Sequence, residues 1–297
     1  MTFLFAELAA FCNALSVVTQ HFASTSAPSG LGWWRLAWRV VRNPMWLIGA
    51  AALLGGFVFQ ALALHDGQLS IVQPLLVTEL VFTLALRRIW FRQHLRPAAW
   101  ASAALTCAAL AVFIIAAEPQ GGHPSPTASA WVWAGVTMGG LAAVFTILAS
   151  WGSPTRRAAL YGAAAAIVWA LEATFIKSTV DILSASGVSA MVTTWPLYAL
   201  IGAGIVGSLL VQAALHVGPI SVSQPIMVSV DPFVSVILSV WLFGERFTAN
   251  PARIVLAGLS FAVMTVGIVL MSRTAPLTLT EDVDPPVGLG ATGAAGA

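Results

Sequence analysis

Apolar runs of about twenty residues recur along nearly the whole chain, and they constrain the fold more than any other feature. Each run is long enough to cross the hydrocarbon core of a bilayer as an α-helix. Only 8% of the 297 residues are charged, whereas charged residues make up about 25% of a typical soluble domain. The sequence therefore predicts a polytopic membrane protein and excludes a soluble globular one.

The spanning segments are expected to be helical. A segment in lipid must satisfy its backbone hydrogen bonds internally, and runs of Ala, Leu, Val and Gly without strand-like alternation favour helices over a barrel. We therefore predict an all-α fold with nine spans. These spans are residues 2–23, 45–64, 71–91, 97–117, 131–150, 158–177, 194–214, 220–243 and 252–272.

The positions of Arg and Lys predict the orientation. If the N-terminus lies outside, ten of the thirteen basic residues are cytoplasmic, and only Lys177, Arg246 and Arg253 remain outside. Short cytoplasmic loops carry such an excess of basic residues, so we predict an external N-terminus and a cytoplasmic C-terminus. The same bias accounts for the net charge of +2, so no nucleic-acid partner is inferred. The preference for Arg over Lys indicates a bacterial plasma (inner) membrane.

Two distant stretches share the same polar residues. LHDGQLSIVQP (Leu64 to Pro74) and LHVGPISVSQP (Leu215 to Pro225) match at His, Gly, Ser and Gln-Pro. Since five crossings separate equivalent spans, the second copy must be inserted upside down relative to the first. Inverted repeats permit two related packings, one open to each side of the membrane. Alternating-access transport is therefore the leading functional hypothesis. The alternative is that the duplication serves only to form a stable helix bundle.

The repeat divides the chain into units. We predict repeat unit 1 over residues 1–117, a linking transmembrane helix over 131–150, an inverted repeat unit 2 over 158–272 and a disordered cytoplasmic tail over 275–297. Between the first two spans, Trp33 to Arg42 is typical of a short interfacial helix with its Arg residues on one face. Its counterpart in the second unit is the segment from Asp181 to Thr194.

A family resemblance rests on three stretches. VQAALHVGPISVSQP (Val211 to Pro225), DPFVSVILSVWLFGERF (Asp231 to Phe247) and the span that follows resemble the drug/metabolite transporter superfamily, and within it the branch of NIPA-type magnesium transporters with nine spans. The resemblance implies a secondary transporter. The sequence departs from the pattern at the end of the third span, where RQHL (Arg92 to Leu95) stands in place of a second GER motif.

Four acidic residues lie within predicted spans, and no Lys or Arg lies in a span interior to neutralise them. An ionised carboxylate at the bilayer centre costs about 2.5–3.5 kcal/mol, and such residues commonly mark ion or substrate pathways. The predicted topology places two of them in the outer third of the membrane and two near its middle. In chain order these acids are Glu7, Glu79, Glu172 and Asp231.

Two mechanisms agree with these acids. In the first, a largely hydrated Mg²⁺ is the transported ion, with Asp231 and Glu79 as the expected metal-binding carboxylates. The amides of Gln60, Gln73, Gln212 and Gln224 would then contact the ion or its water. In the second, one carboxylate takes up a proton, and proton release drives export of a small metabolite or drug. Each acid could also be hydrogen-bonded to a neighbouring helix without any transport role.

Proline marks a further candidate. Pro232 follows Asp231 in mid-span and removes a helical hydrogen bond, so we predict a helix break that leaves the Val228 carbonyl available beside a carboxylate. Pro74 and Pro225 are expected in first helical turns, where a missing N–H costs little.

The sequence thus predicts a secondary transporter and not an enzyme, since it contains neither a nucleophile with a base nor an ATP-binding motif. No cofactor is expected apart from Mg²⁺ as the transported ion. The expected partners are the lipid bilayer and an ion or small-molecule substrate, with a monomer as the simplest form. A non-transporting membrane scaffold remains the alternative of another class.

Overall fold

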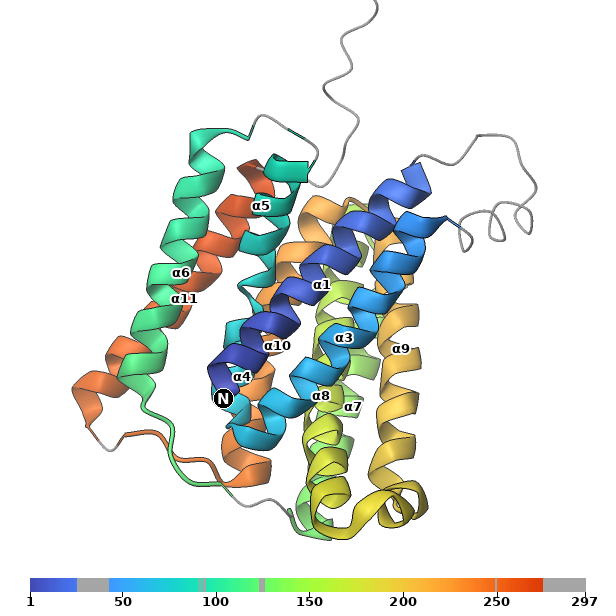
Figure 1. The fold of residues 1–297 in the computed structure, drawn as a ribbon, viewed down its shortest axis with the longest axis vertical. Helices are drawn as coiled ribbons and strands as arrows, with labels where there is room; N and C mark the ends of the chain where they lie inside the picture. The colour runs from blue at the N-terminus through green and yellow to red at the C-terminus, as the bar shows by residue number, and fades with distance from the viewer. Residues whose placement is uncertain (26–42, 91, 93–94, 123–125, 249, 275–297) are drawn as a thin grey trace, which may run out of the picture.

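The computed structural model describes residues 1–25, 43–90, 92, 95–122, 126–248 and 250–274 (Figure 1). The segment Trp33 to Arg42 and the tail 275–297, for which an interfacial helix and disorder were predicted, lie outside these residues. The described chain is almost entirely helical and contains no β-strand apart from one isolated bridge. Its helices are α1 (Thr2–Thr25), α3 (Pro44–Asp66), α4 (Leu69–Leu76), α5 (Glu79–Trp90), α6 (Pro97–Ala117), α7 (Ala128–Leu148), α8 (Pro154–Thr193), α9 (Trp195–Val217), α10 (Ile220–Phe243) and α11 (Pro251–Thr274).

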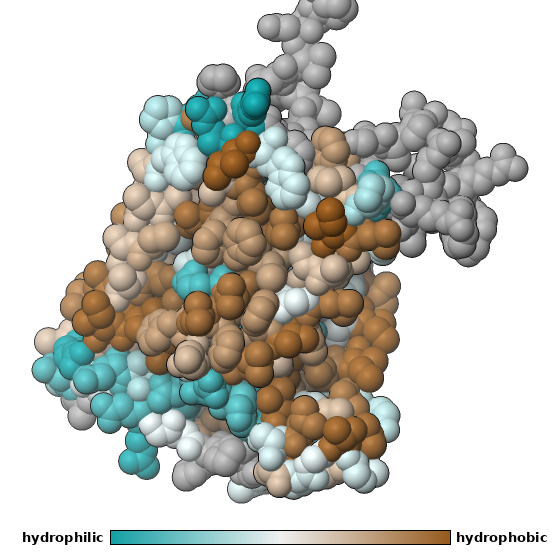
Figure 2. Space-filling view, in the orientation of Figure 1, coloured by the Kyte–Doolittle hydropathy of each residue, from teal (hydrophilic) through white to brown (hydrophobic). Residues whose placement is uncertain are grey.

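Nine segments of the described chain are long and apolar enough to cross a membrane, with α4 and α5 together forming the third. The prediction of an all-α, nine-span membrane protein is therefore confirmed. The spans run up and down, so that α1 begins at one end of the bundle and α11 finishes at the other (Figure 1). We call these ends the N side, where α1 begins, and the C side. On the face shown in Figure 2, apolar side chains cover most of the surface between the two ends.

Several helices begin where capping residues allow it. Asn43 accepts a hydrogen bond from the Met45 N–H, and Ser153 accepts one from the Arg156 N–H. In both cases a proline follows at the first helical position, where its missing N–H is not needed. These caps place helix starts within a few residues of the predicted span edges.

The third span is interrupted, which the sequence analysis did not predict. Helix α4 ends at Leu76 and α5 begins at Glu79, and between them the N–H groups of Val77 and Thr78 bond to carbonyls three residues earlier. Pro74 lies inside α4 and not in its first turn. Conversely, α10 continues as a helix through both Pro225 and Pro232. The break predicted at Pro232 is therefore wrong, and the interruption lies beside Glu79.

Helix α8 is much longer than the predicted span 158–177. It extends to Thr193 and includes most of the segment from Asp181 that was expected to form a separate interfacial helix. The only non-helical residue inside it is Gly187, with φ of 79°. Glycine adopts this left-handed conformation without the strain that a Cβ would cause. The segment from Asp181 thus continues α8 as far as a kink at Gly187, and a further helical piece runs from there to Thr193.

The helices pack in matching pairs. Helix α1 packs on α3 as α8 packs on α9, and α1 contacts α4 and α5 as α8 contacts α10. The remaining extensive contacts join α6 to α11 and α4 to α10, which are equivalent spans of the two predicted units. An inverted repeat with a two-fold axis in the membrane plane would produce this pattern. Helix α7, the predicted linking helix, packs mainly on α8.

Candidate functional site

Three of the predicted acids are half-buried in the bundle, and Asp231 is within electrostatic range of the other two. Asp231 lies near the middle of α10, Glu79 at the first residue of α5, and Glu172 on α8. The carboxylates of Glu79 and Glu172 are close enough to act electrostatically on Asp231. All three side chains are surrounded by the bundle yet retain some accessible surface. We call these three residues the central carboxylates.

Asp231 is held by its own helix. The Ser235 hydroxyl, one turn further along α10, donates a hydrogen bond of 3.2 Å to Asp231 Oδ1. Ser235 itself is fully buried. None of the central carboxylates forms an ion pair with any Lys, Arg or His of the described chain. Their charges are therefore open to a mobile cation or to protons.

Helix α1 supplies partners at the break in the third span. Glu7 Oε2 lies 3.0 Å from the Thr78 hydroxyl, and the Asn13 side chain hydrogen-bonds the Glu79 carboxylate. The same Thr78 hydroxyl also lies 2.7 Å from the Leu75 carbonyl oxygen. A hydroxyl has one hydrogen to donate. When Thr78 donates it to Leu75, its contact with Glu7 is a hydrogen bond only if Glu7 carries a proton.

The predicted amides do not gather with the acids as a set. Gln73 is buried on α4, at 2% exposure, and its Nε2 has no hydrogen-bond partner. Gln60 and Gln224 are half-buried on α3 and α10. Gln212 is exposed on α9. Of the four, Gln73 is thus the one with an unsatisfied polar group in the interior.

The arrangement was also compared with what a metal ion requires. Among the described residues, no three or more His, Cys, Asp or Glu side chains are grouped so that they could hold a metal ion. Mg²⁺ usually keeps several of its waters and takes only one or two carboxylates from the protein. Asp231 and Glu79, the predicted metal ligands, could supply such a pair.

A second polar cluster lies at the N side and was not predicted. Glu245 follows α10 within the GER motif and is almost fully buried, at 1% exposure. Its carboxylate accepts hydrogen bonds from the N–H groups of Leu69 and Ser70 at 2.8 and 3.1 Å and from the Ser70 hydroxyl at 2.5 Å. It thereby caps the N-terminus of α4, where a negative charge is favourable.

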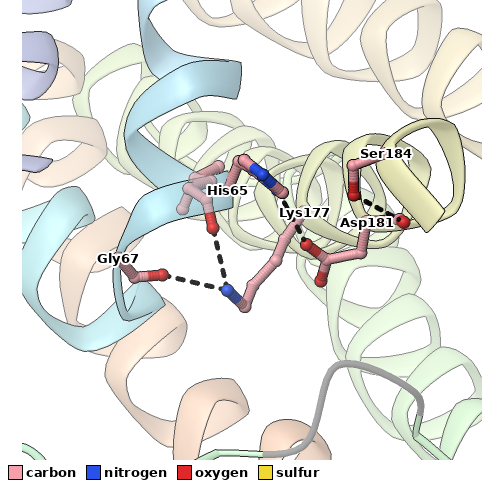
Figure 3. A network of polar contacts seen from close by, with 6 residues as sticks. His65, Gly67, Lys177, Asp181 and Ser184 are labelled. Carbon is pink, nitrogen blue, oxygen red and sulfur yellow. Dashed lines mark hydrogen bonds and ion pairs between the residues drawn. The ribbon is translucent and has the colours of Figure 1, made fainter. Parts of the chain in front are cut away.

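Lys177 on α8 holds the other end of the same junction. Its ammonium group donates to the carbonyl oxygens of Leu64 and Gly67 at 2.8 and 2.9 Å, as Figure 3 shows. One turn along α8, Asp181 Oδ1 lies 3.5 Å from His65 Nδ1. A cavity of about 400 Å³ adjoins these groups. We call the contacts of Lys177, Glu245 and Asp181 with residues 64–70 the N-side network.

The contact between the GER motif and the repeated LHDGQLS stretch was not predicted from the sequence. Two sequence features could have indicated this contact. Both stretches lie at span ends on the same predicted side of the membrane, and one contains an acid while the other contains the start of a helix without a capping residue. Hydropathy carries no information about which span ends are neighbours.

No family model matches the chain, and no solved structure matches it. It is 28% identical over 280 residues to an uncharacterised protein of Corynebacterium glutamicum, and the match covers 92% of this chain and 95% of that protein. The similarity therefore extends through the helices of both predicted units.

Proposed function

We propose that the protein is a secondary transporter that binds a cation at the central carboxylates during alternating access. The observation that carries the proposal is the convergence of Asp231, Glu79 and Glu172 without a basic partner in the described chain. Uncompensated carboxylates at this depth are costly in lipid, and a function that uses their charge explains why the cost is tolerated.

Two further features support transport over a static role. The third span is broken directly beside Glu79, and discontinuous helices at mid-membrane are a common way to build ion and substrate sites in transporters. The pairing of α1 with α3 and of α8 with α9 is consistent with the predicted inverted repeat. The resemblance to the drug/metabolite transporter superfamily points in the same direction.

The first substrate class that we propose is a divalent cation such as Mg²⁺, bound with part of its water shell. A pair of carboxylates from α5 and α10 suits a hydrated ion because water can fill the remaining coordination positions. We also propose that the N side faces outside and that the protein resides in a bacterial plasma membrane. Basic residues then concentrate at the cytoplasmic ends of the spans.

The alternative is a proton-coupled exporter of a small metabolite or drug. The geometry of Thr78 favours it specifically, since a single hydroxyl hydrogen faces both Leu75 and Glu7. Both contacts are satisfied together when Glu7 is protonated and one of them is lost when it is not. A proton on Glu7 would thus be coupled to the local structure at the break in the third span.

The test is flux in reconstituted vesicles, with Mg²⁺ and proton movement measured in parallel for the wild type, Asp231→Asn and Glu118→Gln. Glu118 is the matched control because it is a partly exposed acid at the N side, paired with Arg253. Loss of Mg²⁺ flux in Asp231→Asn alone supports the cation transporter. Proton flux without Mg²⁺ flux supports the exporter, and wild-type behaviour of every variant contradicts both and favours a scaffold.

A further inference from the structure

We infer that the N-side network is a gate, which closes the route from the N side to the central carboxylates and must part when that side opens. The inference rests on the proposed alternating-access function. Each contact of the network joins the first half of the chain, α1 to α6, to the second half, α8 to α11. In an inverted-repeat transporter these halves are the parts that move against each other.

The gate holds one short piece of backbone from two directions. The junction between α3 and α4, residues 64–70, presents free carbonyl groups where α3 ends and free N–H groups where α4 begins. Lys177 contacts the carbonyls of Leu64 and Gly67, and Glu245 contacts the N–H groups of Leu69 and Ser70. Both charges match the sign that the adjacent helix end favours. The junction is therefore fixed by a cation and an anion from the other half.

Packing along the third span agrees with closure at this side. Helix α4, the N-side half of the span, packs both on α10 of the second half and on α1 of its own half, whereas α5 packs mainly on α1. Within the third span, the extensive contact with the second half is thus made at the N side. Lys177 also lies 5.6 Å from the centre of the Phe243 ring, at the end of α10. This places α8, α10 and the junction in one contact region.

The contacts are of a kind that can break and re-form. The network borders a cavity of about 400 Å³ lined by Gln68, Lys177, Asp181 and Glu245, among others. Water from this cavity can solvate the ammonium and carboxylate groups as they separate, so the charges are not left unsatisfied in the open state. The backbone acceptors and donors at the helix ends can bind water in the same way.

The gate is tested by a distance measurement that does not depend on transport. Spin labels are attached to cysteines at Leu62 on α3 and Leu183 on α8, which are both exposed near the N side, with Cys12 and Cys107 replaced by serine. Pulsed electron paramagnetic resonance on the reconstituted full-length protein then reports the distribution of distances between the two helices. The variants are Lys177→Met, Ser70→Ala and, as the matched control, Lys177→Arg.

We expect Lys177→Met to add a population at longer distances, and Ser70→Ala to do so to a smaller extent because it removes one hydrogen bond. Lys177→Arg keeps a charged donor for the two carbonyls and should retain the wild-type distribution. If Lys177→Met and Ser70→Ala both leave the distribution unchanged, the gate is ruled out, whatever the flux assay reports. If the distance distribution shifts in Lys177→Met but the wild type shows no flux, the gate is supported and the proposed transport is rejected.

Discussion

The middle of the bundle and its N side both contain buried acidic side chains, but the surroundings of these acids differ. At the N side, Glu245 accepts three hydrogen bonds and is almost inaccessible. In the middle, Asp231 has one hydrogen bond to Ser235 and two acidic neighbours. One carboxylate is fully occupied with holding the fold together, and the other is left with binding capacity.

The difference separates two reasons for placing a charge inside a membrane protein. A carboxylate that accepts three hydrogen bonds stabilises the contact between two helices and has little capacity left for a ligand. A carboxylate among other carboxylates is stabilised only when something positive arrives. Substitutions at the two places should therefore affect different quantities, stability at the N side and activity in the middle.

The largest effect is expected for Glu245→Ala. The change removes the three hydrogen bonds that the Leu69 and Ser70 groups donate to this carboxylate, and each hydrogen bond to a charged group contributes about 1.5–3 kcal/mol. The apparent melting temperature of the purified protein in detergent should fall clearly. Asp66→Asn, at an exposed acid of the same junction, is the control and should melt as the wild type does. Equal melting temperatures for all three proteins would contradict the role of Glu245 as a cap.

Glu79→Gln should act in the opposite way, with lost flux and retained stability. The amide can still accept a hydrogen bond from Asn13, but the charge that attracts a cation is gone. If that interaction is worth about 1.5–3 kcal/mol, flux should fall about tenfold or more. The measurement is vesicle flux beside a melting curve on the same preparation. If Glu79→Gln lowered the melting temperature and left the flux unchanged, Glu79 would serve stability and not transport, contrary to the proposal.

Gly56→Ala tests whether packing supports the central site. A Cβ at Gly56 would collide with the Asn13 side chain, which contacts Glu79, whereas a Cβ at Gly55 would only touch Cys12 Sγ at 3.6 Å. Alanine gains about 1 kcal/mol of helix propensity over glycine, which offsets part of the clash. We expect a moderate loss of flux with little change in melting temperature for Gly56→Ala, and neither for Gly55→Ala. Identical flux in both variants would show that Asn13 does not position Glu79.

The smallest effect is expected for Glu118→Gln. This residue pairs with Arg253 at the N side, and both side chains are substantially exposed. Exposed ion pairs contribute about 0–1 kcal/mol because water and salt screen them. Flux and melting temperature should both stay close to the wild-type values. A large drop in either would mean that the N side depends on surface charge and not on the buried network.

Helix positions followed from the sequence because hydropathy and length determine which segments can reside in lipid. The predicted limits of the spans 97–117 and 220–243 coincide with α6 and α10. The choice of buried acids rested on the same reasoning, since a charge in an apolar run is visible without knowledge of its neighbours. That Asp231, Glu79 and Glu172 share one interior region depends on helix packing, which the sequence did not specify.

The errors concern local geometry and distant contacts. The break was expected at Pro232, where one hydrogen bond is missing, but α10, which packs on α8 and α4, stays helical there. The break occurs instead after Leu76, two residues beyond Pro74, where the repeated motif ends. Val77 and Thr78 form the turn. The contact between Glu245 and residues 69 and 70 spans about 175 positions, and no periodicity in the sequence indicates it.

The interruption at Val77 and Thr78 has a mechanical consequence for the whole molecule. A continuous helix is stiff and must tilt as one piece. In a helix that is interrupted at mid-length, each segment can move with a different neighbouring helix. Here α4 packs on α10 as well as on α1, whereas α5 packs mainly on α1, so the two segments have different neighbours to follow. The turn between them adjoins Glu79 and contacts Glu7 through Thr78, so a change in the angle between α4 and α5 would also shift these two acids.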